Sequence, residues 1–274
     1  SSAASDVYKR QVPYIDSYWE FKGNPDYGMR IHILPDGCTD FIFTLGEVAN
    51  AVEEGSLIMQ PYRSYFVGPM TKYSELVTYT ESIHMFGVRF LPCGLSCFTN
   101  LPLHEFVNSR VSTNEMKAVF DDTFIEKLGE QKHVTDRIRV VEEYLLAYLA
   151  RHYQPADSHV AMAVNMINHS KGKRSVRSLM DDVCLCQRHF ERKFKHYTGF
   201  TPKEYSRIVK FKNAVELLRT TTSANLLTTA VDAGYYDLAH FSKEIKSMSG
   251  NTPASFLSLT VPEETTLTYI EPQR

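Results

Sequence analysis

An internal repeat near the C-terminus is the feature that most restricts how this chain can fold. When the C-terminal third is aligned with itself at an offset of 51 positions, the His-Phe dipeptide at 189–190 falls on the one at 240–241. The same register gives six identities in 17 aligned positions, including a glycine and a Thr-Pro pair. Average composition predicts about one identity, so one structural unit occurs twice.

The first copy of the unit is predicted to contain two helices and a tight turn. Ser175 caps a helix with an apolar face, and the turn at 184–186 follows it. A second helix then covers 187–197, and Gly199 ends it in the left-handed conformation that glycine tolerates.

The second copy repeats this order behind a helical spacer. The spacer carries an apolar stripe formed by Ile208, Phe211, Val215 and Leu218. The turn at 234–236 leads into a helix that Asp237 caps. Two helices joined in this way form a helix-turn-helix, which places its second helix in a DNA major groove.

The charge distribution favours the same partner. Segment 171–256 holds 15 Lys and Arg against 8 Asp and Glu, a net charge of +7, whereas the rest of the chain carries −9. A basic module beside an acidic one indicates a polyanionic partner for the first. We therefore predict binding to double-stranded DNA, with two recognition helices in successive major grooves roughly 34 Å apart.

At these residues the sequence resembles the C-terminal module of AraC-type transcription regulators. The stretches RHFERKFKHYTGFTPKEYSRIVKF and AVDAGYYDLAHFSKEIKSMSGNTPASF carry the resemblance, which covers about residues 158–257. The duplicated glycine, Thr-Pro and aromatic positions fall where that family has them. The resemblance implies a double helix-turn-helix DNA-binding domain that extends over residues 156–258, followed by a tail at 259–274.

Carried over by position, the resemblance assigns base-contacting residues in both recognition helices. They are Arg188, Glu191 and Arg192 in the first helix and Leu238, Ala239, Ser242 and Lys243 in the second. Arginine can bridge O6 and N7 of guanine, and glutamate can accept from cytosine N4. Three further residues are expected at phosphates, namely Gln187, Lys195 and Lys246.

Two places depart from the family pattern. Leu238 and Ala239 stand where relatives usually have polar residues, which leaves thymine methyls or backbone contacts for readout there. Cys186 stands where a hydroxyl normally caps the helix, so that helix end is expected to be weaker by about 1 kcal/mol. Specificity should therefore come mainly from the first recognition helix.

The N-terminal part is predicted to be β-rich. Short apolar runs are separated by turn signals, a spacing typical of a barrel or sandwich. The predicted strands cover residues 18–21, 31–34, 41–45, 57–60, 64–67, 76–79 and 83–90. The stretches ILPDGCTDFIFTLG, FVGPMT and MFGVRFLPCGLSCFTNLPLHEF are similar to an uncharacterised cupin-like domain. The predicted fold class is α+β: a cupin-like β-barrel or sandwich at 12–155 with C-terminal helices, then an all-α domain of two helix-turn-helix units.

Five residues of this part are candidates for a ligand pocket inside the barrel. They are Trp19, His32, Asp40, His84 and Arg89. Strand alternation alone does not show which face points inward, so the alternative that they are ordinary core or surface residues stays open. The expected ligand is a small-molecule effector whose identity the sequence does not give.

We predict no catalytic residues, no metal and no cofactor. Cupin enzymes hold a metal with two histidines one residue apart and a nearby glutamate, whereas the histidines of this part stand alone. The pairs Cys93 and Cys97, and Cys184 and Cys186, lack the paired CxxC spacing of a zinc site. We interpret the cysteines as buried small apolar residues, with a redox pair as the alternative.

The remaining expectations concern assembly and location. The apolar face of a predicted helix at 134–153 fits either a homodimer interface or the chain's own barrel. No apolar run approaches the roughly 18 residues of a membrane helix. Five cysteines without a signal-peptide pattern favour the cytoplasm. Residues 1–11 carry no apolar period and are interpreted as a cloning remnant.

These features predict a one-component, sequence-specific transcription regulator under control of the N-terminal domain. RNA polymerase is a further candidate partner. Two alternatives remain: an enzyme with a catalytic N-terminal barrel fused to a DNA-targeting module, and an N-terminal domain that serves only assembly.

Overall fold

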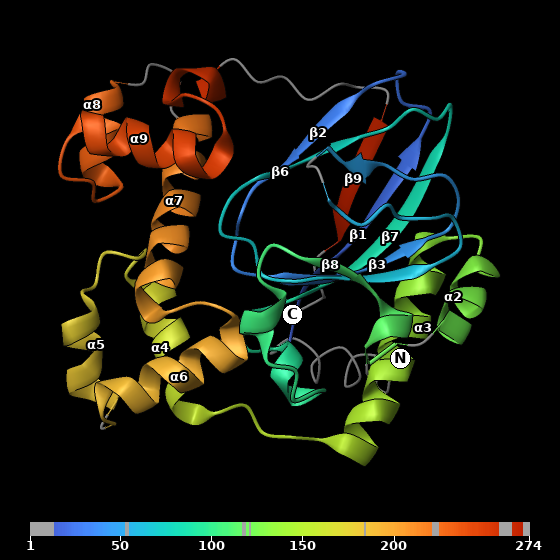
Figure 1. Ribbon diagram of the computed structural model, residues 1–274, viewed down its shortest axis with the longest axis horizontal. Helices are drawn as coiled ribbons and strands as arrows, with labels where there is room; N and C mark the ends of the chain where they lie inside the picture. Colours follow the sequence, from blue (N-terminus) through green and yellow to red (C-terminus); the bar gives the residue numbers. More distant parts are fainter. Residues whose placement is uncertain are drawn as a thin grey trace.

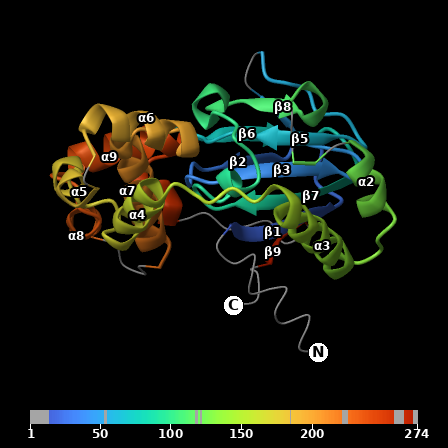
Figure 2. The ribbon, with the colours of Figure 1, turned by 90° about the horizontal axis from the view of Figure 1, so that it is seen from below.

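The protein consists of a β-rich region followed by a helical region. The computed structural model describes residues 14–52, 55–116, 119–120, 122–183, 185–220, 225–257 and 265–270. Figure 1 shows the strands with helices α2 (Asp122–Gly129) and α3 (Val134–His152) at one end, and helices α4 to α9 at the other. In Figure 2 the two regions lie side by side, connected by the segment between α3 and α4.

The β-rich region contains two antiparallel sheets. The larger has the order β8 (Arg110–Ser112), β5 (Ser64–Val67), β3 (Thr39–Thr44), β7 (Ile83–Phe90), β1 (Ile15–Gly23) and β9 (Thr265–Ile270). The smaller has the order β2 (Arg30–Ile33), β6 (Ser74–Val77) and β4 (Asn50–Ala51). Short 3-10 helices lie at η1 (Leu95–Cys97), η2 (Leu103–Phe106) and η3 (Thr113–Glu115).

Both faces of the larger sheet are covered. Because side chains alternate across a strand, neighbouring residues of one strand point into different cores. In β3, Phe41 and Phe43 belong to a core shared with α2 and α3, whereas Ile42 belongs to a core shared with the smaller sheet. Every residue of β3 is accordingly buried. The predicted order of a β-rich domain before a helical one is confirmed.

Helix α3 uses its apolar face inside its own chain. Ile138, Val141 and Leu145 are buried in the core that also holds Phe86. The Tyr144 hydroxyl donates to the carbonyl oxygen of Val119 at 2.7 Å, which fixes the helix beside α2. Of the two uses predicted for this face, the structure shows packing on the chain's own sheet.

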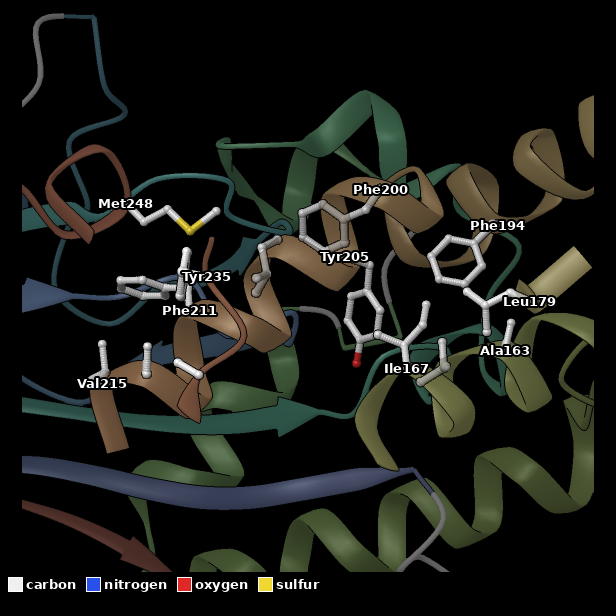
Figure 3. Packing of buried hydrophobic residues seen from close by; sticks show 14 of the residues in the cluster. Ala163, Ile167, Leu179, Phe194, Phe200, Tyr205, Phe211, Val215, Tyr235 and Met248 are labelled. Carbon is white, nitrogen blue, oxygen red and sulfur yellow. The ribbon is translucent and has the colours of Figure 1, made fainter. Parts of the chain in front are cut away.

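The helical region is built around one apolar cluster. Its elements are α4 (Ser158–His169), α5 (Val176–Val183), α6 (Gln187–Thr198), α7 (Pro202–Thr220), α8 (Leu226–Asp232), α9 (Leu238–Ser249) and η4 (Pro253–Leu257). Figure 3 shows this cluster running from Leu179 and Phe194 past Tyr205 to Phe211 and Tyr235, so that both units share it. The N-terminal domain adds the buried Cys93 to the same cluster.

One predicted strand is wrong. Residues 57–60 form no strand, because neighbouring side chains take their backbone donors: Met59 N–H donates to Asn50 Oδ1 at 2.6 Å, and Gln60 N–H donates to the Tyr65 hydroxyl at 2.7 Å. Strand β6 pairs with β2 on one edge and with β4, at residues 50 and 51, on the other. Strand β8 and helix α2 were not predicted at all.

The chain returns to the first domain after the second unit. Strand β9 pairs with β1 from Tyr18–Ile270 to Gly23–Thr265, on the edge opposite β8. This strand falls within the segment 259–274 that was predicted only as a tail. Residues 1–11, interpreted as a cloning remnant, lie outside the described residues.

Candidate nucleic-acid interface

The first unit comprises α5 and α6. Ser175 accepts a hydrogen bond from the Ser178 N–H at 3.1 Å, as predicted for its capping role. Phe190 and Phe194 are buried on the inner side of α6, and Gly199 ends the helix with a φ of 85°. The predicted helix, its apolar side and its glycine stop are confirmed. The burial of two phenylalanines fixes which side of α6 faces outward.

The outer side of α6 carries polar and charged residues. Gln187, Arg188, Arg192 and Lys195 are exposed, and Glu191 is half-buried. Gln187 Nε2 donates to Glu191 Oε1 at 2.8 Å, and Arg192 Nη2 lies 3.2 Å from His189 Nδ1. Donors and an acceptor therefore alternate along one exposed face, which is the chemistry that reads base edges.

The N-terminus of α6 has no side-chain cap. Cys186 occupies the cap position, is exposed and makes no capping hydrogen bond, so the predicted departure is confirmed. The N–H groups at the start of α6 carry the positive end of the helix dipole. This end can attract a phosphate oxygen.

The second unit comprises α8 and α9. Asn225 accepts from Leu227 N–H at 3.0 Å, and Asp237 accepts from His240 N–H at 2.7 Å, so both helices are capped. Phe241 and Ile245 are buried on the inner side of α9, and Gly250 ends it with a φ of 72°. The outer side presents Leu238, Ala239, Ser242, Lys243 and Lys246, all exposed except the half-buried Ser242.

Helix α7 holds the two units together. It begins with a reciprocal cap in which Thr201 N–H donates to Glu204 Oε2 at 2.7 Å and Glu204 N–H donates to Thr201 Oγ1 at 3.2 Å. Its predicted apolar stripe is buried at Ile208, Phe211, Val215 and Leu218. Toward the second unit, Arg207 pairs with Glu244 of α9 at 2.9 Å. The spacer is thus packed against both units rather than standing free.

A loop of the N-terminal domain, residues 68–73, contacts both units at equivalent places. A Cβ on Gly199 would lie 2.5 Å from Pro69 Cγ, and a Cβ on Gly250 would lie 2.6 Å from Tyr73 Cζ. Tyr73 N–H also donates to the Met248 carbonyl oxygen at 2.8 Å. Because these glycines occupy the same position of the repeat, one loop holds the C-terminal ends of both recognition helices.

Three of the five pocket candidates lie together inside the N-terminal domain. Trp19 Nε1 donates to Asp40 Oδ1 at 2.7 Å, and Arg89 Nη2 lies 3.1 Å from Asp40 Oδ2. Arg89 Nη1 also lies 2.7 Å from Asp36 Oδ2. Burial raises the pKa of Asp40, and the adjacent Arg89 guanidinium opposes that shift. Within this group the carboxylates of Asp36 and Asp40 are both paired with the guanidinium of Arg89.

The other two candidates lie elsewhere. His84 is on the opposite face of the larger sheet, where its Nε2 lies 3.0 Å from Glu20 Oε1. The hydrogen bond with His84 lowers the pKa of Glu20, and the charge of Arg137 reinforces the shift. His32 lies at the edge of the smaller sheet and stacks on Tyr73, with ring centroids 5.6 Å apart. Strand parity separates these histidines from Trp19.

The core between the two sheets is formed mainly by apolar side chains. Phe21, Ile42 and Met85 belong to it together with Trp19. A small pocket of ≈ 10 Å³ lies elsewhere, next to Tyr73, Ser74 and Arg110. That volume has room for about one water molecule.

The cysteines show no metal or disulfide arrangement in the part of the chain that the structure describes. Cys38, Cys93 and Cys97 are free and buried, and burial raises the pKa of the Cys93 thiol. Cys186 is exposed, so the prediction of a buried residue is wrong there, because the cap position lies at the surface. Cys184 lies outside the described residues. Among the residues described, no group of three or more His, Cys, Asp or Glu could hold a metal ion.

No helix in the described part of the chain is long and apolar enough to span a membrane.

Sequence reasoning missed four residues at or near these sites. Nothing in the sequence indicates the contacts of Pro69 and Tyr73 with the two units, because the residues that they meet lie far away along the chain. Asp36, in the Pro-Asp-Gly stretch at 35–37, was not a candidate, yet it pairs with Arg89. Tyr236 was only a turn residue, but its side chain is 92% exposed beside the start of α9. Two successive tyrosines in a turn are the signal that could have found it, since only Tyr235 is buried.

Two family models match the chain. A model described as a helix-turn-helix domain matches residues 179–258, and a model described as a domain of unknown function, DUF6597, matches residues 11–112. A search of curated proteins gives no match.

Solved structures of ToxT from Vibrio cholerae share the fold. One at 1.65 Å resolution has a TM-score of 0.53 and 10% sequence identity, covering 88% of this chain and 98% of that chain. A second, described as bound to an unsaturated fatty acid, has a TM-score of 0.51 and 12% identity, covering 88% of this chain and 95% of that chain. Both regions of this chain are therefore arranged as in a known fold.

The duplicated unit with its two capped and glycine-terminated helices, the helix-turn-helix match and the shared two-domain fold agree with one another. This chain therefore carries a C-terminal helix-turn-helix domain behind an N-terminal β-rich domain, in the two-domain fold that it shares with ToxT.

Proposed function

We propose that this protein binds specific DNA sites mainly through α6 and assists that binding through α9. The observation that carries this proposal is the exposed outer face of α6, where Arg188, Arg192 and Glu191 stand opposite two buried phenylalanines. A recognition helix with donors and an acceptor on its outer face can distinguish base pairs in the major groove.

The other exposed groups have a supporting role. Arg188 and Arg192 bind guanine, and Glu191 accepts from cytosine N4 once Gln187 turns from it to a phosphate. Lys195 and Lys246 contact phosphates. The uncapped start of α6 adds backbone donors for a phosphate oxygen.

Selection of binding sites from random duplex DNA tests this proposal. The purified full-length protein is used at two salt concentrations. We expect an enriched motif that extends over two successive major grooves, and an affinity that falls steeply with salt as counterions leave the phosphates. Salt-sensitive binding to any duplex without an enriched motif would contradict sequence-specific regulation.

We further propose that a small molecule bound in the N-terminal domain controls DNA binding. Support comes from the shared fold with ToxT, of which one structure holds an unsaturated fatty acid. The core between the sheets is formed mainly by apolar side chains, which suits the hydrocarbon part of such a ligand. Residues Trp19, Asp40 and Arg89 line the place where a polar group of the ligand would be held.

Trp19 is the sole tryptophan of the chain and thus a reporter of that site. Titration with an unsaturated fatty acid, followed by tryptophan fluorescence and by DNA affinity, tests the effector proposal. We expect saturable changes in both signals. A silent tryptophan and an unchanged DNA affinity would count against this class of effector and favour an N-terminal domain that serves only assembly.

Assembly and turnover complete the proposal. A homodimer through α3 would have to use the outward polar face, at Arg139 and Glu143, because the apolar face is buried. We propose RNA polymerase as a partner on DNA.

We assign no catalytic step to the N-terminal domain, since Asp40 and Arg89 are paired with each other. A turnover assay with the purified protein would detect such a step.

A further inference from the structure

The two recognition helices present different chemistry at equivalent positions. In the register of the repeat, Leu238 takes the place of Gln187, and Ala239 takes the place of Arg188. The first turn of α6 thus offers an amide and a guanidinium, whereas the first turn of α9 offers two apolar side chains. These are the residues that a helix-turn-helix brings to base edges, because the N-terminal part of the recognition helix enters the groove.

The apolar start of α9 is open to solvent. Leu238 keeps 38% of its surface exposed and Tyr236, in the preceding turn, keeps 92%. At the matching place before α6, Leu185 is partly buried against the core of the helical region. The second unit therefore displays an apolar surface, formed by Tyr236, Leu238 and Ala239, where the first unit displays polar groups.

The helix ends differ in the same sense. Asp237 accepts from His240 N–H and places a carboxylate at the start of α9, where it offsets the positive end of the helix dipole. Cys186 leaves the start of α6 without such a cap. The start of α9 is thus less suited to hold a phosphate than the start of α6.

The major groove offers one apolar group on its base edges, the C5-methyl of thymine. We propose that α9 reads thymine methyls through Leu238 and Ala239, with Tyr236 extending the contact along the groove. The half of the DNA site under α9 is therefore rich in A·T pairs, and the first turn of α9 recognises it by methyl contact rather than by hydrogen bonds. This inference rests on the proposed sequence-specific DNA binding.

Replacing thymine by uracil tests it, because uracil lacks only the C5-methyl and keeps the O4 acceptor. The selected site is synthesised with uracil in one half at a time, and the half under α6 is identified by the base position that Arg192→Ala relaxes. We expect affinity to fall about fourfold for each contacted methyl that is removed under α9, which is the effect of burying one such group. Uracil under α6 should change affinity less than about twofold.

Variants of the full-length protein assign the effect to α9. Leu238→Ala should lower the affinity for thymine-containing DNA and reduce the thymine–uracil difference, since Ala239 and Tyr236 keep part of the contact. Leu238→Gln should shift the preferred base toward adenine, to which an amide can make two hydrogen bonds. Leu227→Ala is the matched control, since Leu227 is another exposed leucine of the same unit, 53% exposed on α8. It should keep the thymine–uracil difference.

The outcomes separate this inference from the proposed function. Equal affinity for thymine and uracil under α9, with a motif still enriched under α6, overturns the inference and leaves the proposed function standing. Absence of any enriched motif overturns both. A thymine–uracil difference that is undiminished in Leu238→Ala also overturns the assignment to α9.

Discussion

The two helix-turn-helix units share a backbone but differ in what they show to DNA. Both recognition helices end at a left-handed glycine, with φ of 85° at Gly199 and 72° at Gly250, and both bury aromatic or aliphatic residues on the inner side. On the outer side the first has Gln187, Arg188 and Glu191, whereas the second has Leu238, Ala239 and Ser242.

The difference teaches that duplication preserved the features that fold the unit and not the outer residues, which we propose read bases. A glycine stop and a buried phenylalanine are required in each copy, because the same turn and the same core recur. The outer positions are free to differ, since they do not contribute to the core. One fold can thus combine a recognition helix with a hydrogen-bonding outer side and one with an apolar outer side.

Substitution of Gly199 or Gly250, which end the two recognition helices, should have the largest effect on stability. Gly199→Ala should lower the free energy of unfolding by about 2–4 kcal/mol, through the left-handed backbone and a clash with the rigid ring of Pro69. Gly250→Ala should cost about 1–2 kcal/mol, since the Tyr73 side chain that it meets can rotate. Urea unfolding of both variants measures the difference.

A double variant separates strain from clash. Gly199→Ala in a Pro69→Ala background should cost less than in the wild type, because the smaller side chain removes the contact and leaves only the backbone strain. The same cost in both backgrounds would show that loop 68–73 does not hold α6 as described.

The two recognition helices should respond differently to the loss of a positively charged side chain. Arg192→Ala should weaken specific binding by about 1–3 kcal/mol and relax one base position. Lys246→Ala, which removes a proposed phosphate contact of α9, should weaken binding more evenly across sequences and reduce the salt slope by about one. Site selection with each variant provides the measurement. An unchanged base preference for Arg192→Ala would remove Arg192 from the readout.

The caps predict opposite effects of about equal size. Asp237→Ala should lower stability by about 1 kcal/mol, because the His240 N–H loses its acceptor. Cys186→Ser should raise stability by up to about 1 kcal/mol by supplying the acceptor that α6 lacks. Thermal unfolding of the two variants is sufficient. A destabilised Cys186→Ser protein would contradict the account of that helix end.

The smallest expected effect is that of oxidation. Cys93 and Cys97 are buried and free, and we expect DNA binding of the wild type to be insensitive to mild oxidant. The variant with Cys184→Ser and Cys186→Ser should behave in the same way in a DNA-binding titration. Sensitivity of the wild type alone would revive the redox alternative.

The helical region could be predicted from sequence because its signals are local. A cap, a 3.6-residue apolar period and a glycine followed by Thr-Pro specify each helix and its end without knowledge of distant contacts. Ser175, Asp237 and Gly199 therefore have the roles that their types and positions predict. The loop that contacts both units could not be predicted, since Pro69 and Gly199 are far apart in the sequence.

The N-terminal domain was predicted less fully, because strand pairing is not local. Residues 57–60 have the composition of a strand, but side chains of Asn50 and Tyr65 bind their backbone donors. His84 and Arg89 lie on one strand, and whether each faces the smaller sheet or α3 depends on parity within it. Only the paired structure shows that Arg89 joins Trp19 and Asp40 while His84 joins Glu20.

The central claim is that two unequal units, held by α7, act together on one face of a duplex. Inserting about half a helical turn, roughly 5 base pairs, between the two halves of the selected site tests it most directly. We predict that affinity falls to that of a site containing only the half under α6, and that roughly 10 inserted base pairs do not restore it, because α7 is packed against both units. An affinity that is unchanged by the half-turn insertion would contradict the claim.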